Sequence, residues 1–196
     1  MIHFVNGETQ QNQNKEFTIS PGEINRALIF IFIPSMVVLS LPFMILWRHH
    51  ILLNFKHILI DKFWLALPVF ISGVIFHELL HGLTWALFAD GGIKSVKFGF
   101  SKMTLTPYCH CKKPIRVKYY ICGGLLPVIV LGVVPLLISM LTGNAAFYIF
   151  GLFFSLAAAS DILICWKVRK LKSDAMVQDF PDKPGCHLVT EELDTK

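Results

Sequence analysis

The sequence predicts an all-α membrane protein with about four transmembrane helices and a short cytoplasmic β-hairpin between the second and third. Three observations support this class. Of the 196 residues, 54% are hydrophobic and only 16% are charged, proportions unlike those of a soluble domain. Four apolar segments each have about the 20 residues that a spanning helix needs. The hydrophilic stretch between the second and third segments alternates apolar and polar residues, as a strand does.

The apolar segments define the domain organisation. They lie at residues 27–47, 64–89, 119–141 and 145–168. Because they leave little chain for a soluble domain, we expect one membrane domain over 27–168, with the loop 90–118 inside it. A polar N-terminal tail over 1–26 and an irregular C-terminal tail over 169–196 flank that domain.

The chain signals the start of its first helix locally. Ser20 suits a helix N-cap, Pro21 the first helical position and Glu23 the third, as in a capping box. Within the first span, Pro34 and Pro42 each remove a backbone donor, so we expect them to bend it.

Basic residues predict the orientation in the bilayer. The N-terminal tail, the 90–118 loop and the C-terminal end from Lys167 carry 2, 7 and 6 Lys/Arg, whereas the other side carries only Arg48, Lys56 and Lys62. The positive-inside rule therefore places both termini and the loop in the cytoplasm. No basic stripe is interleaved with aromatic residues, so the lipid bilayer, and not a nucleic acid, is the expected partner.

The motif HELLH at residues 77–81 carries the chemistry of this chain. His77 and His81 are four residues apart, so on a helix both imidazoles lie on one face and can hold one zinc ion. Glu78 beside them has the position of a general base. The motif lies within an apolar span, where ionisable side chains are costly and indicate a functional site. The alternative is a His/Glu cluster that is hydrogen-bonded within a helix bundle.

The loop after the second span predicts a turn and a hairpin. Asp90-Gly91-Gly92 is a turn signal, and the alternation over residues 93–106 is typical of two short strands. The sequence Cys-His-Cys follows at 109–111. Cysteines only two apart make poor partners in a structural zinc site, and no second pair completes a set. A structural zinc site here and a contribution of His110 to the active site both remain open.

A catalytic zinc needs a third protein ligand, and Asp161 is the best candidate. It is the only carboxylate besides Glu78 well inside an apolar span, and residue counting puts it at nearly the depth of His81. The small residues 157–160 before it allow close helix contact. The alternative is an aspartate that is hydrogen-bonded to a neighbouring helix; Asp90 and His110 are the next candidate ligands.

These residues resemble a known family. An HELLH motif in a membrane span, a short β-region and a later span with an aspartate resemble the core of site-2-protease-type intramembrane metalloproteases. The stretch SDIL at 160–163, with DFP at 179–181 and GC at 185–186, resembles still more closely a bacterial membrane group of zincin peptidases. The resemblance covers about residues 64–188. It implies zinc held by His77, His81 and Asp161, with Glu78 as general base. It departs from site-2 proteases at Ile162, where they usually carry glycine.

The expected function follows from these residues. We expect an intramembrane zinc metalloprotease of the bacterial plasma membrane that hydrolyses a peptide bond of a membrane-embedded or juxtamembrane protein or peptide. A non-catalytic membrane zinc-binding or assembly protein that retains the motif is the alternative. Di-iron desaturase-type chemistry would need several histidine boxes, and the sequence has one.

Overall fold

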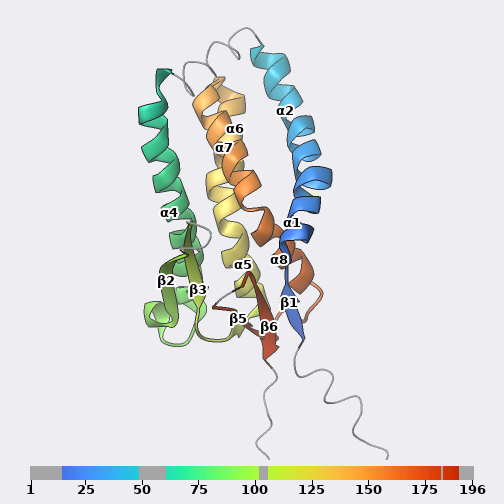
Figure 1. The fold of residues 1–196 in the computed structure, drawn as a ribbon, viewed down its shortest axis with the longest axis vertical. Helices are drawn as coiled ribbons and strands as arrows, with labels where there is room; N and C mark the ends of the chain where they lie inside the picture. Colours follow the sequence, from blue (N-terminus) through green and yellow to red (C-terminus); the bar gives the residue numbers. More distant parts are fainter. Residues whose placement is uncertain (1–14, 49–60, 102–105, 182, 190–196) are drawn as a thin grey trace, which may run out of the picture.

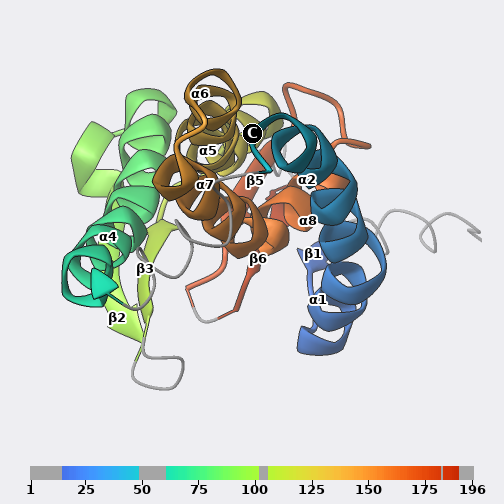
Figure 2. The same ribbon diagram turned by 90° about the horizontal axis from the view of Figure 1, so that it is seen from above.

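The helices of the chain form a bundle, and the strands gather at one end of it (Figure 1). The computed structural model describes residues 15–48, 61–101, 106–181 and 183–189. Seen from above, α4 (Phe63–Phe88) lies on one side of the central helices and the α1–α2 column, which begins at Pro21 and ends at Trp47, on the other (Figure 2).

The first column begins at the predicted cap. Ser20 Oγ accepts a hydrogen bond from the Glu23 N–H at 3.2 Å, and Glu23 Oε2 accepts one from the Ser20 N–H at 2.8 Å, so the predicted capping box is confirmed. The column then consists of α1 (Pro21–Ala27), a π-helical segment (Leu28–Phe32) and α2 (Ile33–Trp47).

A second π-helical segment lies in the central column of α5 (Val117–Pro127), Val128–Val133 and α6 (Val134–Thr142). Each π-helical segment directly precedes a helix with proline near its start, Pro34 in α2 and Pro135 in α6. Proline lacks an N–H and crowds the carbonyl four residues back, and a wider turn relieves that crowding.

The predicted fourth span is a bent pair of helices. Helices α7 (Ala145–Ala157) and α8 (Ala159–Val168) meet at an angle of 46° at Ala158. Within the described residues, three other helices are long and apolar enough to cross a membrane: Pro21–Trp47, Phe63–Phe88 and Val117–Thr142. Large apolar side chains on their surfaces are exposed, among them Phe30 (74%), Trp64 (80%) and Leu87 (79%). Such exposure is expected of helices that face lipid.

The hairpin lies further along the chain than the 93–106 stretch in which it was expected. Its strands are β2 (Val96–Ser101) and β3 (Thr106–Cys111). Residues Gly92–Ser95 form a 3₁₀ turn instead, because Gly91 and Gly92 have positive φ angles of 96° and 60° and extend the predicted turn. The Cys-His-Cys sequence therefore belongs to the second strand.

A four-stranded antiparallel sheet lies beside the hairpin, so the chain is mostly helical but not all-α. Its strand order is β1-β6-β5-β4, formed by Glu16–Thr18, Gly185–Val189, Met176–Asp179 and Ile115–Arg116. The expectation of an irregular C-terminal tail is wrong, since β5 and β6 lie in it. These strands have only two to five residues, too few to show a period, and β1 pairs with a strand about 170 residues away.

The sheet and the helices share one hydrophobic core. Buried side chains of α4, α5 and α8 pack there against those of the strands, among them Trp85, Cys111, Tyr120, Val168 and Val177. The candidate site lies immediately next to this core, where a side chain of α4 meets one of α8.

Candidate metal centre

Helix α4 presents the two motif histidines on one face. His77 and His81 are 8% and 5% exposed, and their Nε2 atoms lie 3.2 Å apart. The rings meet edge to face, with centroids 4.8 Å apart. The spacing of four residues thus brings two ligand-type nitrogens to one point, as the helical period requires.

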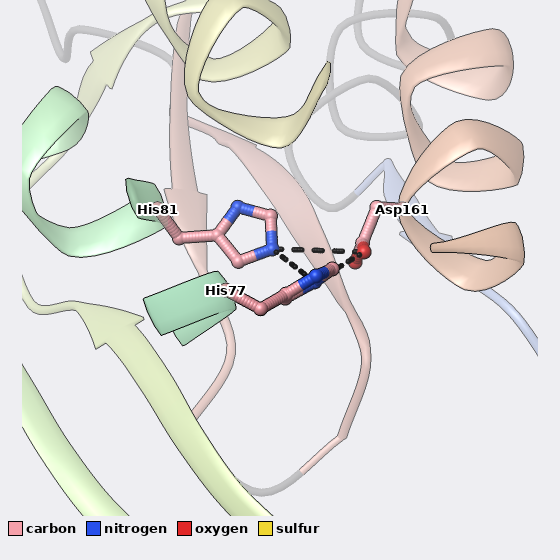
Figure 3. Close-up of side chains that lie close together, drawn as sticks. All are labelled: His77, His81 and Asp161. Carbon is pink, nitrogen blue, oxygen red and sulfur yellow. Dashed lines mark hydrogen bonds and ion pairs between the residues drawn. The ribbon is translucent and has the colours of Figure 1, made fainter. Parts of the chain in front are cut away.

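Asp161 reaches the same point from α8. Its Oδ2 atom lies 3.2 Å from His77 Nε2 and 3.6 Å from His81 Nε2 (Figure 3). One ligand atom from each residue can be chosen so that all lie within 4.8 Å of one another. The structure therefore brings the three predicted ligands together.

The bend between α7 and α8 determines how Asp161 arrives there. Asp161 lies in the first turn of α8, directly after the bend, where Ala158 and Ala159 are fully buried. Residue counting along a straight span predicted that Asp161 lies near His81. The two side chains do lie close together, but the helix that carries Asp161 is bent and not straight. Of the predicted small residues, Ala159 packs against Ala27 and Phe32 of the first helical column.

A backbone contact orients His81. Its Nδ1 lies 2.8 Å from the Gly123 carbonyl oxygen of α5. Because a carbonyl only accepts, Nδ1 carries the proton and donates it, and the neutral ring then keeps a lone pair on Nε2. A Cβ at Gly123 would overlap the indole of Trp85, whose Nε1 donates to the Tyr120 carbonyl at 3.2 Å. The glycine therefore permits the helix approach that fixes this tautomer.

Glu78 lies half-buried next to the histidines and faces the hairpin. Its carboxylate lies beside the backbone N–H of Cys109 in β3. The hairpin packs tightly here, because a Cβ at Gly82 would overlap Phe98 and would lie 2.9 Å from Cys109 Sγ. The predicted base is thus placed between the histidine pair and a β-strand, a contact that the sequence did not reveal.

The Cys-His-Cys sequence belongs to a second polar cluster. His110 Nδ1 lies 3.4 Å from Asp179 Oδ2, at the end of β5. His110 Nδ1 makes no well-formed hydrogen bond in this contact. Among the residues that the structure describes, only His77, His81 and Asp161 form a group able to hold a metal ion. His110 and Asp90, the alternative candidate ligands, are therefore not part of it.

Asp179 is the centre of that second cluster, and the sequence singles it out only as part of the DFP resemblance at 179–181. Its Oδ2 accepts the Cys111 N–H at 3.3 Å, and its Oδ1 accepts the Tyr120 hydroxyl at 3.2 Å. Burial raises the pKa of its carboxyl above the usual value, although neighbouring hydrogen bonds act in the opposite direction. Burial also raises the pKa of the Cys186 thiol on the adjacent strand to about 12. No sequence spacing links these residues, because they come from β3, α5, β5 and β6 and meet only in the folded chain.

The donor set of the first cluster fits a zinc ion. Two imidazole nitrogens and one carboxylate oxygen are the ligands of catalytic zinc sites, which leave a fourth position open. His81 Nε2 carries no proton in the tautomer set by Gly123, so it has none to donate to Asp161. The two ring nitrogens and the carboxylate oxygen then share at most the one Nε2 proton of His77, and a cation would stabilise such a group.

Comparison with known families agrees with this chemistry. A family model described as "Putative zincin peptidase" matches residues 70–176, more than half of the chain, and the match includes both histidines and Asp161. No curated protein and no solved structure gives a significant match.

Proposed function

This chain belongs to the family described as "Putative zincin peptidase", and from this premise we propose that it hydrolyses a peptide bond in a membrane-embedded or juxtamembrane protein. The observation that carries the proposal is the convergence of His77 Nε2, His81 Nε2 and Asp161 Oδ2, with Glu78 one residue from the first ligand. The apolar helices of Pro21–Trp47, Phe63–Phe88 and Val117–Thr142 support a membrane location.

In this proposal His77, His81 and Asp161 hold the zinc. Bound zinc would supply Lewis acidity, which acidifies a water molecule and polarises a carbonyl group. His81 binds through Nε2 because Gly123 keeps the proton on Nδ1, and this second contact also fixes the ring orientation. Asp161 contributes the negative charge that compensates the ion in a low-dielectric environment.

Glu78 is the general base and acid of the proposed reaction. It accepts the proton of the attacking water and later donates a proton to the leaving amine. It is not itself a ligand, so its removal should separate chemistry from metal binding. The Cys109 N–H keeps its carboxylate beside the site.

The experiment compares three variants of the full-length protein in native membranes and after purification in detergent. Glu78→Gln should keep the zinc content of the wild type, measured by elemental analysis, because glutamine has a similar volume. In cells, the N-terminal peptides created by the wild type should be absent from the membranes of this variant. His77→Ala should lose both zinc and the new peptides. Asp174→Asn, a surface carboxylate variant, should keep both.

One outcome favours the alternative of a non-catalytic zinc-binding or assembly protein. In that case Glu78→Gln membranes would contain the same peptides as the wild type, while His77→Ala would still impair the protein. A wild-type protein that binds no zinc would contradict both functions.

We also propose that the strand-bearing end lies in the cytoplasm and that α7 and α8 together form the fourth span. The excess of Lys/Arg in the loop and tails supports this orientation. Reporter fusions after Lys112 and at the C-terminus should then be cytoplasmic, and a fusion after Thr142 should lie on the opposite side. A C-terminus on that opposite side would contradict the proposed topology.

A further inference from the structure

The free edge of β3 is capped by two carboxylates. In the hairpin Cys109 pairs with Phe98 and Cys111 with Val96, while the Lys112 N–H donates to the Ser95 carbonyl at 2.7 Å. Since N–H groups alternate along a strand, those of Cys109 and Cys111 point away from β2. The Glu78 carboxylate lies beside the N–H of Cys109, and Asp179 Oδ2 accepts the N–H of Cys111 at 3.3 Å.

These two contacts lie close together on one rigid element. Residues two apart on a strand are roughly 7 Å apart, so the carboxylate of the proposed base and the carboxylate of Asp179 hold neighbouring points of the same edge. A shift of β3 at Cys111 would therefore also move the Cys109 N–H away from Glu78.

Asp179 is itself fixed from α5 and β5. The hydroxyl of Tyr120 donates to its Oδ1 at 3.2 Å, and both residues are buried. The Tyr120 ring stacks on Trp85 with centroids 5.3 Å apart, and Trp85 stacks on His81 at 5.2 Å. The anchor of β3 is thus built into the same packing that orients the histidine.

We propose that Asp179 is a positioning residue for Glu78: it anchors β3 so that the Cys109 N–H holds the base beside the zinc ligands. The inference rests on the proposed function for the role of Glu78, but the anchoring itself can be measured without substrate. Asp179 touches neither zinc nor substrate and acts only through the strand.

The thiol of Cys109 reports the position of β3. It packs against Gly82 of α4, and burial raises its pKa, so in the intact protein it should react slowly with N-ethylmaleimide. Cys165 in α8 is buried against Gly124 and reports unfolding of the helices instead. Mass spectrometry of labelled peptides distinguishes the two sites in the full-length zinc-loaded protein.

Asp179→Ala should speed the labelling of Cys109 about tenfold or more while the rate at Cys165 stays unchanged, because a buried charged hydrogen bond is lost locally. Tyr120→Phe, which removes only the hydroxyl, should give a smaller increase at Cys109 and covers the case in which Asp179→Ala does not fold. Asp174→Ala, at a side chain 64% exposed, should change neither rate. Zinc content should be that of the wild type in all three.

The cleavage products measured above separate this inference from the proposed function. If the anchoring holds and the base acts as proposed, Asp179→Ala should reduce those peptides without loss of zinc. A different result would be faster labelling of Cys109 in Asp179→Ala while Glu78→Gln membranes contain the same peptides as the wild type. That result would support the anchoring of β3 and reject the proposed catalysis. Unchanged labelling in both Asp179→Ala and Tyr120→Phe, or equal acceleration at Cys109 and Cys165, would overturn the anchoring.

Discussion

Two aspartates of this protein each lie beside histidine, and their surroundings differ in one respect, the supply of protons. Asp179 receives an N–H from Cys111 and an O–H from Tyr120. Asp161 faces the Nε2 atoms of His77 and His81. The proton of the His81 ring lies on Nδ1, which donates it to the Gly123 carbonyl. The first carboxylate is satisfied by the protein, whereas the second shares with both rings at most the one Nε2 proton of His77, an arrangement that a cation would stabilise.

The comparison shows that a His–Asp pair alone does not identify a metal site. Both pairs have separations of 3.2–3.4 Å and both are largely buried. What distinguishes them is how many further hydrogen-bond donors surround each carboxylate. The predictions that follow test whether this difference determines where the ion binds.

The largest effect should come from the histidines. His77→Ala or His81→Ala should weaken zinc binding by more than about 100-fold, the upper end of losses seen when only supporting contacts are removed. Competition with a chelator measures the affinity. The matched change in the other cluster, His110→Ala, should leave it unchanged; an equal loss there would remove the distinction between the clusters.

Asp161 should come next. Asp161→Asn should weaken zinc binding about tenfold, because a neutral amide replaces an anionic ligand, and Asp161→Ala should weaken it further because no oxygen remains. In a metal-loaded structure its oxygen should lie about 2.0–2.2 Å from zinc. Wild-type affinity in Asp161→Ala would exclude it as a ligand.

Asp179 should affect stability and not metal affinity. Asp179→Ala should lower the free energy of unfolding by about 1–3 kcal/mol, because the Cys111 N–H and the Tyr120 hydroxyl lose their acceptor. Thermal unfolding of the zinc-free protein in detergent measures this loss. Zinc affinity that falls as much as in Asp161→Ala would show that the second cluster also serves the metal.

The smallest effect should be a pH dependence of stability. The pKa of Asp179 is raised by burial, so between the ordinary value of 3.8 and the raised value the folded state binds more protons than the unfolded state. Stability should therefore fall as pH rises through that window. Asp179→Asn should flatten this part of the profile, with Tyr120, His110 and Cys186 left in place around it. A profile identical to that of the wild type would mean that Asp179 does not titrate there.

Local patterns predicted more of this molecule than distant ones. The Ser20 cap and the convergence of His77 with His81 follow from spacings of three and four residues, which a sequence displays directly. Asp161 could be selected because a carboxylate within an apolar segment needs a partner. The bend at Ala158 carries no proline or glycine signal. The anchoring by Asp179 depends on strands too short and too far apart in the chain to reveal their pairing.

The four-stranded sheet has a consequence for how often the chain crosses the bilayer. Strand β1 precedes the apolar helices, β4 lies between α4 and α5, and β5 follows α8. All three belong to one sheet, in which Ile115 of β4 pairs with Val177 of β5. Paired strands lie on the same side of a membrane, so the number of crossings between any two of them is even. In the proposed topology the α1–α2 column and α4 are two crossings before β4. After β4, the α5–α6 column would be one crossing, and only a crossing by the bent α7–α8 pair would make that number even.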